Sequence, residues 1–390
     1  MTHPIPMARV AGRGEKRIAG GHPWVYRSDV VDVQAEAGDI VTVVGSRERR
    51  LGQALFSDRS QITLRMLTRG DEQATEAVIG ERVARAAAYR TSLAIDATAY
   101  RLVHGEADLL PSLVVDRYGD WLVLQALSQG MDRLVPLVVQ TLVDVMRPTG
   151  ILARNDPRVR ALEGLPQEVR LLYGDVPADI EVREGPVSYL VDPWKGQKTG
   201  LFLDQRENRE AAARYARGRL LDCFSYNGGF GLYLAGKCAS VECLDVSEEA
   251  VSRTTANAER NGIDHLAARA VNVFDELRSL ERDGARYDTI VLDPPAFAKN
   301  KASVPQALSG YKEINLRAMR LLPPGGVLVT CSCSYNVDEV TFLDVVREAA
   351  SDSRISMAVV ERRTQGRDHP ALLGAPETSY LKCLILRRLE

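Results

Sequence analysis

Residues 221–231 read Leu-Asp-Cys-Phe-Ser-Tyr-Asn-Gly-Gly-Phe-Gly, an apolar run that passes directly into a glycine-rich turn. The run predicts a buried strand, and glycines at a strand-to-helix turn let the backbone come close to a ligand. From about residue 204 onward, strand-like and helix-like segments alternate with short connections. This alternation is typical of parallel βαβ units, so we predict an α/β fold with a doubly wound, Rossmann-like sheet.

The strands of this sheet can be placed from their apolar, β-rich runs. We expect them at residues 220–223, 241–245, 268–271, 289–292, 327–331, 357–362 and 380–387. A helix is expected to begin with Asp204 as its N-cap and to end at Gly218. Ligands of such sheets bind at the carboxyl ends of the strands, near the point where the strand order reverses. The residues that follow these strands are therefore the candidate site.

The chain before this sheet has a different pattern. Residues 1–72 contain β-rich runs at 41–44, 51–56 and 62–67, which predict a small β-barrel. Residues 73–192 predict a separate α+β domain, with helices at 77–93 and 134–146 and strands at 121–127, 179–183 and 187–191. We expect residues 193–390 to form the third domain, which carries the doubly wound sheet.

Several classes of protein are disfavoured by composition. No apolar run approaches the roughly 20 residues that a membrane-spanning helix needs, and the N-terminus lacks the apolar stretch of a signal peptide. We therefore expect a cytoplasmic protein with no membrane partner. The six cysteines form no Cys-x-x-Cys pair and match no zinc or disulfide spacing, so no metal site is predicted.

Charge alone does not identify a partner, because the net charge is only −2. Positive side chains nevertheless outnumber negative ones in the first 70 residues, mostly through Arg9, Arg13, Lys16, Arg17 and Arg27. A solvated basic face is one interpretation of this excess. Contact with RNA is the other, and on that interpretation Arg13 and Lys16 are candidate RNA-binding residues.

The acids at the first two strand ends indicate which ligand the glycine turn binds. In a dinucleotide site such a turn holds a pyrophosphate, but a carboxylate at Asp222 would repel one. An acid there suits a cationic amino-acid ligand. Asp245, which ends the second strand about twenty residues on, is placed to bind ribose hydroxyls. Together these residues predict an S-adenosylmethionine (AdoMet) site and argue against a dehydrogenase.

The fourth and fifth strand ends carry the candidate chemistry. Residues 293–297 read Asp-Pro-Pro-Ala-Phe, which resembles the Asp-Pro-Pro motif of class I methyltransferases that act on nucleobases. Residues 330–336 read Thr-Cys-Ser-Cys-Ser-Tyr-Asn. Carbon-5 of cytosine is a poor nucleophile until a thiolate adds to carbon-6 and converts the ring to an enamine. Cys333 is nearer the strand's carboxyl end than Cys331, so it is the preferred nucleophile.

These residues resemble the RlmI-type 23S rRNA cytosine carbon-5 methyltransferases, and the likeness covers nearly the whole chain. It is carried by residues 21–26 (Gly-His-Pro-Trp-Val-Tyr), 101–106, 110–111, 115–118, 196–206, 368–370 and 377–382. The resemblance implies an N-terminal RNA-binding PUA domain, RNA as partner and 23S rRNA as substrate. Family members are often homodimers, so it also allows a homodimer here.

The resemblance also implies roles for individual residues. It assigns Cys333 as nucleophile, as the similar Sun-type RNA cytosine methyltransferases do, and it places Asp293 against the cytosine ring. The cofactor site implied is Asp222, Phe224, Ser225, Tyr226, Gly228, Asp245, Ser247, Asn272 and Asp293. Further candidate contacts to RNA are Lys198, Pro294, Pro295 and Phe297. Asn272 stands where an Asp commonly accepts a hydrogen bond from adenine, and an Asn oxygen can accept the same bond.

Two other functions remain open from the sequence. An exocyclic-amine methyltransferase acting on guanine can also carry a Pro-Pro motif, and its chemistry needs no thiol. A noncatalytic RNA-binding or ribosome-assembly protein could keep the same fold, because fold does not establish function.

Overall fold

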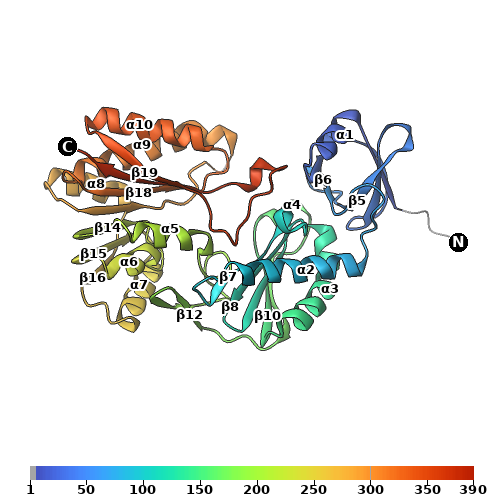
Figure 1. Cartoon of the computed structure of the whole chain (residues 1–390), viewed down its shortest axis with the longest axis horizontal. Coiled ribbons are helices and arrows are strands. Elements are labelled where there is room, and N and C mark those ends of the chain that lie inside the picture. The colour runs from blue at the N-terminus through green and yellow to red at the C-terminus, as the bar shows by residue number, and fades with distance from the viewer. Residues whose placement is uncertain (1–5, 299) are drawn as a thin grey trace. The chain divides into compact units, whose positions relative to one another are not determined.

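The computed structural model describes residues 6–298 and 300–390, which form two compact units. Unit 1 comprises residues up to Val182 together with Val191–Leu203 and Arg367–Thr378. Unit 2 comprises Arg183–Leu190, Asp204–Gly366 and Ser379–Glu390. The chain therefore passes between the units several times. Figure 1 shows the elements of both units.

The first part of unit 1 is a six-stranded sheet. Its strands are β1 (Met7–Val10), β2 (Trp24–Tyr26), β3 (Val30–Gln34), β4 (Ile40–Val44), β5 (Arg50–Phe56) and β6 (Ile62–Met66), in the order β2-β6-β5-β4-β1-β3. Helix α1 (Gly12–Ala19) packs its buried Ile18 into the apolar core of this sheet. The predicted β-rich fold is confirmed. The sequence did not predict β1, β2, β3 or α1, because these elements are short and lack a long alternating pattern.

The second part of unit 1 is a five-stranded sheet with helices. The strands are β7 (Ala99–His104), β8 (Leu113–Tyr118), β9 (Trp121–Ala126), β10 (Gly150–Asn155) and β11 (Glu168–Gly174), in the order β11-β10-β9-β8-β7. The helices are α2 (Glu76–Ser92), α3 (Gln129–Met146) and α4 (Val159–Leu162). Thr75 and Ser128 cap α2 and α3 through their hydroxyls. The predicted α+β fold is confirmed, although α3 begins five residues earlier than expected.

Buried charge joins the two sheets of unit 1. Arg65 of β6 donates 2.7 Å to Glu163, and both side chains are almost fully buried. Ser57 donates to the other oxygen of Glu163 at 2.7 Å. Because a buried carboxylate is costly unless it is paired, these bonds tie Glu163, which follows α4, to β6 and to the residue after β5.

Residues 367–378 bring distant motifs of unit 1 together. The carboxylate of Asp368 accepts the Arg101 backbone N–H at 2.9 Å, and Glu377 lies 3.2 Å from His22. Four of the stretches that carry the family resemblance, at 21–26, 101–106, 368–370 and 377–382, thus contribute residues to these two contacts.

Unit 2 contains a seven-stranded sheet. Its strands are β14 (Arg219–Cys223), β15 (Ser240–Asp245), β16 (Leu266–Ala270), β17 (Thr289–Leu292), β18 (Val327–Ser332), β19 (Met357–Arg363) and β20 (Lys382–Arg388). The order is β16-β15-β14-β17-β18-β20-β19, parallel from β16 to β18, with β20 antiparallel to both neighbours. The strand order reverses beside β14, which is where a ligand site is expected.

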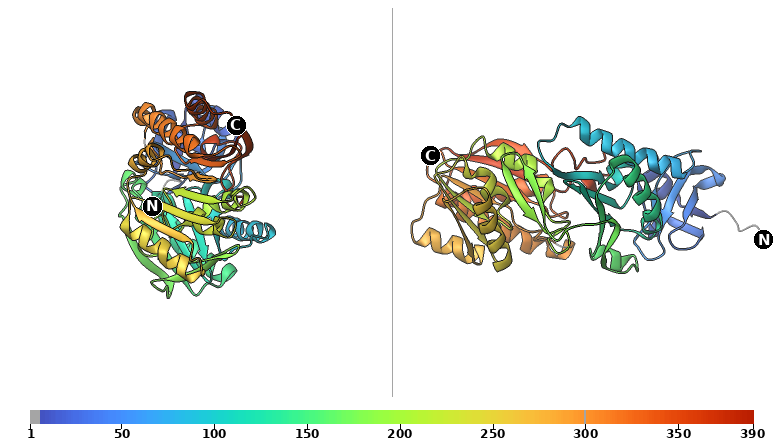
Figure 2. Two further views of the ribbon diagram at one scale, coloured as in Figure 1. Left: turned by 90° about the vertical axis from the view of Figure 1, so that its left-hand side faces the viewer. Right: turned by 90° about the horizontal axis from the view of Figure 1, so that it is seen from below.

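Helices cover both faces of this sheet (Figures 1 and 2). They are α5 (Arg206–Ala212), α6 (Gly229–Ala235), α7 (Glu248–Arg260), α8 (Val273–Arg282), α9 (Val304–Leu321) and α10 (Glu339–Ser353). One buried apolar cluster joins the sheet to α8, α9 and α10, and another joins it to α5 and α6. A hairpin of β12 (Ile180–Glu184) and β13 (Val187–Val191) has its tip in unit 2. The predicted Rossmann-like α/β fold is confirmed.

One local prediction is wrong. Asp204 does not cap a helix that runs to Gly218: α5 begins at Arg206 and ends at Ala212. The Asp204 carboxylate instead accepts a hydrogen bond from the Tyr380 hydroxyl at 2.7 Å, so it binds a residue distant in sequence and does not cap a helix. The expected last strand is present as β20, and it pairs antiparallel with β18 and β19.

Among the described residues, no helix combines the length and the apolar character that crossing a bilayer requires.

Candidate active site

Asp222 is the most buried acid at the carboxyl edge of the unit 2 sheet. It is 1% exposed, and its Oδ2 accepts the Gly231 backbone N–H at 2.7 Å. Its Oδ1 is buried without a hydrogen-bond partner among the described residues, and so is the hydroxyl of Ser225. Orphaned buried polar atoms at a strand end indicate a place where a polar ligand binds.

The electrostatics of Asp222 indicate the sign of that ligand. Burial raises the pKa of Asp222 to about 8, and the nearby carboxylates of Asp293 and Asp245 add to the rise. The Gly231 N–H opposes it. A carboxyl with so high a pKa is mostly protonated at neutral pH in the absence of a ligand. A positively charged ligand would stabilise its ionised form, so the site favours a cation.

The turn after β14 packs too closely against its neighbours to accept a side chain at two of its glycines. Gly228 has φ +83°, and a Cβ there would lie 2.8 Å from Thr254 Cγ2. A Cβ on Gly231 would lie 2.4 Å from Cys243 Sγ and 3.1 Å from Asp222 Oδ2. Phe224 and Tyr226 also have positive φ, at 63° and 51°. Left-handed backbone at non-glycine residues is costly and is often found at functional sites.

The end of β15 continues the cofactor side of the site. Asp245 Oδ2 accepts the Tyr226 N–H at 2.8 Å and Oδ1 accepts the Ser247 N–H at 3.0 Å. Each oxygen keeps a lone pair for a hydroxyl group. Ser247 caps α7 by accepting from Ala250.

Asn272 has a structural role at the end of β16. Its side-chain oxygen caps α8 and accepts the N–H groups of Phe274 and Asp275, at 2.9 and 3.4 Å. A hydrogen bond from adenine to that oxygen would therefore compete with the cap. The adenine contact of Asn272 stays a prediction.

Aromatic side chains from three connections meet beside these acids. The ring of Phe224, after β14, lies 6.3 Å from Phe274 and 6.2 Å from Phe297, which follows β17. Phe297 in turn lies 4.7 Å from Tyr311 of α9. This cluster gives the strand ends an apolar wall.

Asp293, directly after β17, is oriented by an amide that the sequence did not single out. Gln205 Nε2 donates to Asp293 Oδ1 at 2.8 Å. The Gln205 oxygen is itself fixed because Asn208 donates to it at 2.6 Å. Asp293 is thus held in one orientation beside the glycine turn.

The structure separates the two cysteines of the fifth strand. Cys331 is fully buried, and burial raises its pKa well above the ordinary value, with a further contribution from Cys383 opposite it in β20. Cys333 lies just after the strand ends and is half-buried, whereas the other five cysteines are buried. Its thiol donates to the Pro294 carbonyl at 3.8 Å. Of the two, only Cys333 is placed to meet a substrate.

Hydroxyl groups fix the loop that carries Cys333. Ser332 donates to the Tyr311 hydroxyl at 3.0 Å, and that hydroxyl lies 2.9 Å from Ser334 Oγ. Ser334 Oγ also accepts the Ala298 N–H at 3.1 Å. The loops after β17 and β18 are therefore tied together.

Further residues at this edge were not predicted. Arg209 donates twice to Glu184, at 2.6 Å each, and both side chains are buried. Lys382 is also buried beside the Cys333 loop. Their partners are distant in sequence, so no local pattern could reveal them.

The predicted site residues divide between the units. Those that follow the strand ends of unit 2 are Asp222, Phe224, Ser225, Tyr226, Gly228, Asp245, Ser247, Asn272, Asp293, Pro294, Pro295, Phe297 and Cys333.

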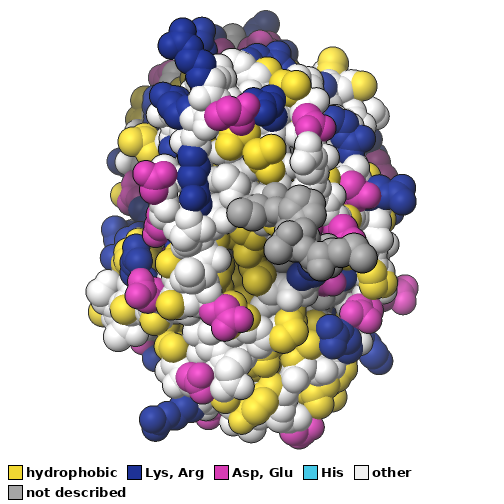
Figure 3. Space-filling model, turned by 90° about the vertical axis from the view of Figure 1, so that its right-hand side faces the viewer, with side chains coloured by type: hydrophobic (Ala, Val, Ile, Leu, Met, Phe, Trp, Pro, Cys, Tyr) yellow, Lys and Arg dark blue, Asp and Glu magenta, His cyan; other side chains and the backbone are white. Residues whose placement is uncertain are grey.

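The remaining candidates, Arg13, Lys16 and Lys198, are exposed and belong to unit 1. Arg13 forms an ion pair with Asp29 at 2.5 Å, and Lys198 lies 4.3 Å above the Phe202 ring. On the face drawn in Figure 3, basic side chains are interspersed with acidic ones.

Comparison with known families gives the class of protein. Residues 167–387 match the family model described as an S-adenosylmethionine-dependent methyltransferase, and residues 8–69 match that of a PUA-like domain. The fold, the acids at the strand ends and these matches define an AdoMet-dependent methyltransferase with a PUA-like domain.

Relatives narrow the class. The chain is 41% identical over 383 residues to the ribosomal RNA large subunit methyltransferase I of Shewanella amazonensis, covering 96% of this chain and 97% of that protein. It is 40% identical over 389 residues to the protein of the same name from Aeromonas hydrophila subsp. hydrophila, covering 97% and 98%. The chain belongs to the ribosomal RNA large subunit methyltransferase I family.

Solved structures support the fold. A protein from Streptococcus mutans described as a SAM-dependent methyltransferase superposes with a TM-score of 0.84 at 19% identity, covering 98% of this chain and all of that one. Another structure, described as a methyltransferase complexed with SAH, superposes with a TM-score of 0.86 at 20% identity, again covering 98% of this chain and all of that one.

Proposed function

We propose that this protein methylates carbon-5 of a cytosine in large-subunit ribosomal RNA, through a covalent adduct between Cys333 and carbon-6. The observation that carries the proposal is the position of the Cys333 thiol. It is the least buried of the six cysteines and lies 3.8 Å from the Pro294 carbonyl, in the loop that Asp293 begins. Methyl transfer to an exocyclic amine would need no thiol there.

The cofactor residues fit AdoMet. The orphaned Asp222 Oδ1 and Ser225 hydroxyl suit a cationic amino-acid group, and Asp245 keeps lone pairs for ribose hydroxyls. The turn between them carries Gly228 at positive φ, where a Cβ would lie 2.8 Å from Thr254 Cγ2. When bound, AdoMet supplies an electrophilic methyl group.

The residues of the chain act on the base in a fixed sequence. The Cys333 thiolate adds to carbon-6, and the electron pair of the 5,6 double bond moves so that carbon-5 becomes nucleophilic. Asp293, oriented by Gln205, contacts the ring and holds it in register. After carbon-5 has gained the methyl group, a base removes its proton. The pair of that C–H bond re-forms the double bond and expels the thiolate.

The target base must leave any helical stack before it can react. With domain boundaries near residues 72 and 192, the PUA-like and middle domains would bind the flanking RNA. Arg13, Lys16 and Lys198 are the candidate contacts to phosphate. Such contacts release counterions, so RNA affinity should fall steeply as salt is raised.

RNA containing 5-fluorocytosine tests the chemistry, because fluorine on carbon-5 blocks the final elimination. Wild-type protein with AdoMet should form an adduct that survives denaturing gels and maps to Cys333 by peptide mass spectrometry. Cys333→Ala should form no adduct and lose methylation, whereas the control Cys331→Ala should keep both. Full methylation by Cys333→Ala would contradict the proposal and favour a guanine amine as acceptor. Failure to bind AdoMet in calorimetry would favour a noncatalytic RNA-binding protein.

A further inference from the structure

Lys382 is a buried cation that forms no ion pair with a carboxylate of the described residues. It begins β20, is 6% exposed, and its Nζ donates to the carbonyl oxygens of Ser334 and Tyr380 at 2.8 and 2.9 Å. Both acceptors are neutral. Over residues 6–298 and 300–390, no Asp or Glu forms an ion pair with this ammonium group.

This arrangement is unusual for a buried charge. Taking an ammonium group out of water is costly unless an opposite charge compensates for the loss of solvation. Other buried cations of the chain have such a partner: Arg65 bonds Glu163, and Arg209 bonds Glu184. Lys382, by contrast, has only neutral hydrogen-bond acceptors among the described residues.

Two ionisable groups face Lys382. Burial lowers the pKa of Lys382 to about 8, and Cys333 and Asp338 oppose that change. Asp338 is exposed, and its carboxylate already caps α10 by accepting the Thr341 N–H at 2.8 Å. Cys333 is half-buried, and its neighbour Ser334 supplies the carbonyl that binds the ammonium. Cys333 is thus the better-placed counter-charge.

We propose that the ammonium group of Lys382 stabilises the thiolate of Cys333 and that this ion pair prepares the nucleophile. The S–H bond breaks with its electron pair left on sulfur, the proton passes to solvent, and Lys382 keeps its own proton. The inference rests on the proposed function, in which Cys333 attacks the base. Lys382 is a positioning residue, because it acts through the sulfur and not on the RNA.

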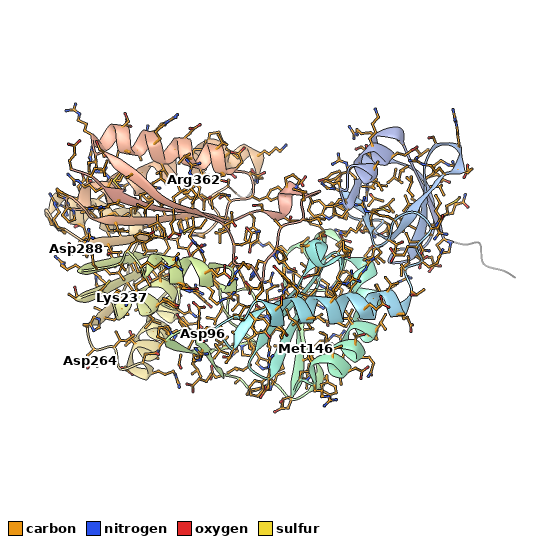
Figure 4. The ribbon with its side chains drawn as sticks, in the orientation of Figure 1. Asp96, Met146, Lys237, Asp264, Asp288 and Arg362 are labelled. Carbon is orange, nitrogen blue, oxygen red and sulfur yellow. The ribbon has the colours of Figure 1, made fainter. Side chains whose placement is uncertain are left out.

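The pH dependence of alkylation tests this pairing. Iodoacetamide reacts with thiolates, and Cys333 is the cysteine that is not buried, so the Cys333→Ala rate provides the background. In Lys382→Met, the midpoint of the Cys333 rate profile should move up by about one pH unit or more. Lys382→Arg keeps the positive charge, so its midpoint should lie close to that of the wild type. Lys237→Met, which removes an exposed lysine of unit 2 (Figure 4), is the matched control and should leave the midpoint unchanged. An unchanged midpoint in folded Lys382→Met would overturn the inference.

A reciprocal measurement does not require Lys382 to be replaced. Two coupled groups shift each other by the same amount, so loss of the thiolate should lower the midpoint at which Lys382 titrates. NMR of protein labelled with ¹³C-lysine can follow that midpoint in wild-type and Cys333→Ala protein. Equal midpoints in the two proteins would also overturn the pairing.

The outcomes separate this inference from the proposed function. If the 5-fluorocytosine adduct forms but neither midpoint moves, the thiol mechanism stands and the ion pair is refuted. If both midpoints move but no adduct forms, the ion pair is supported and the proposed reaction is refuted.

Discussion

Replacing Asp222 by asparagine should make the ligand-free protein more stable and at the same time weaken AdoMet binding. The carboxyl has a pKa of about 8 in the folded protein, against 3.8 for an ordinary Asp. Between these values the folded state binds more protons than the unfolded state, so this group lowers stability as pH rises from about 4 to about 8. The side-chain amide of the Asp222→Asn variant would retain the oxygen that accepts from Gly231 but would carry no charge.

The size of the effect follows from the same shift. Each pKa unit corresponds to about 1.4 kcal/mol, so at pH 7 the burial of this acid opposes folding by about 4 kcal/mol at most. The new amide N–H₂ must be desolvated, which costs about 1–3 kcal/mol. We therefore expect a net gain of about 1–3 kcal/mol at pH 7. The gain should be largest near pH 8 and vanish between about pH 4.5 and pH 6, where the electrostatic term equals the cost of the amide. At lower pH the variant should be the less stable protein.

Thermal unfolding from pH 4 to pH 9, with and without AdoMet, measures both effects. The apparent Tm of Asp222→Asn should exceed that of the wild type by about 2–4 °C per kcal/mol near neutral pH. AdoMet should raise the wild-type Tm and have little effect on the variant, because a lost charged contact weakens binding by about tenfold to hundredfold.

The control is Asp288→Asn at the opposite edge of the same sheet (Figure 4). Asp288 accepts the Arg219 N–H at 2.8 Å, so the change is chemically matched but lies away from the strand ends. It should leave AdoMet binding intact. A variant at 222 that is less stable than wild type by a pH-independent amount would refute the electrostatic reasoning.

Three further predictions concern the surroundings of the site and the scaffold. Gly231→Ala should lose measurable AdoMet binding and about 1–3 kcal/mol of stability, because its Cβ would lie 2.4 Å from Cys243 Sγ. Gly236→Ala is the control, since the new Cβ would have no atom within 4 Å, and it should bind AdoMet normally in the same calorimetric titration. Gln205→Leu should lower kcat with little change in AdoMet affinity, since it frees the Asp293 carboxylate but leaves Asp222 and Asp245 unchanged. Steady-state kinetics with RNA would contradict this if only the AdoMet affinity fell. Glu163→Ala should destabilise unit 1 by about 3–5 kcal/mol, because it leaves Arg65 buried without its ion-pair partner. A denaturant midpoint equal to that of the wild type would show that this ion pair does not stabilise unit 1.

Local patterns were sufficient where a short stretch of chain determines its own structure. The strand at 289–292 and the strand at 187–191 were predicted with the observed bounds, because each is a continuous β-rich run between turn residues. The glycine turn and the acids that follow β14 and β15 could also be identified, since parallel strands place their carboxyl ends at one edge. The AdoMet-dependent class of the protein followed from those residues.

The contacts of several site residues depend instead on partners that are distant in sequence. Asp204 has the residue type of a helix cap, yet it binds Tyr380 because the fold brings that hydroxyl within 2.7 Å. Gln205 orients Asp293 from 88 positions away. Neither contact leaves a periodic signal in the sequence.

The choice between the two cysteines of the fifth strand shows the same division. The sequence by itself determined that Cys331 and Cys333 stand at a strand end beside the candidate site, and position along the strand favoured Cys333. Only the tertiary structure decided their environments: Cys331 faces Cys383 in the core, whereas Cys333 emerges beside Pro294 with Lys382 buried nearby. The reason is physical, because burial and the charges around a thiol depend on strands that pair across about fifty residues of chain.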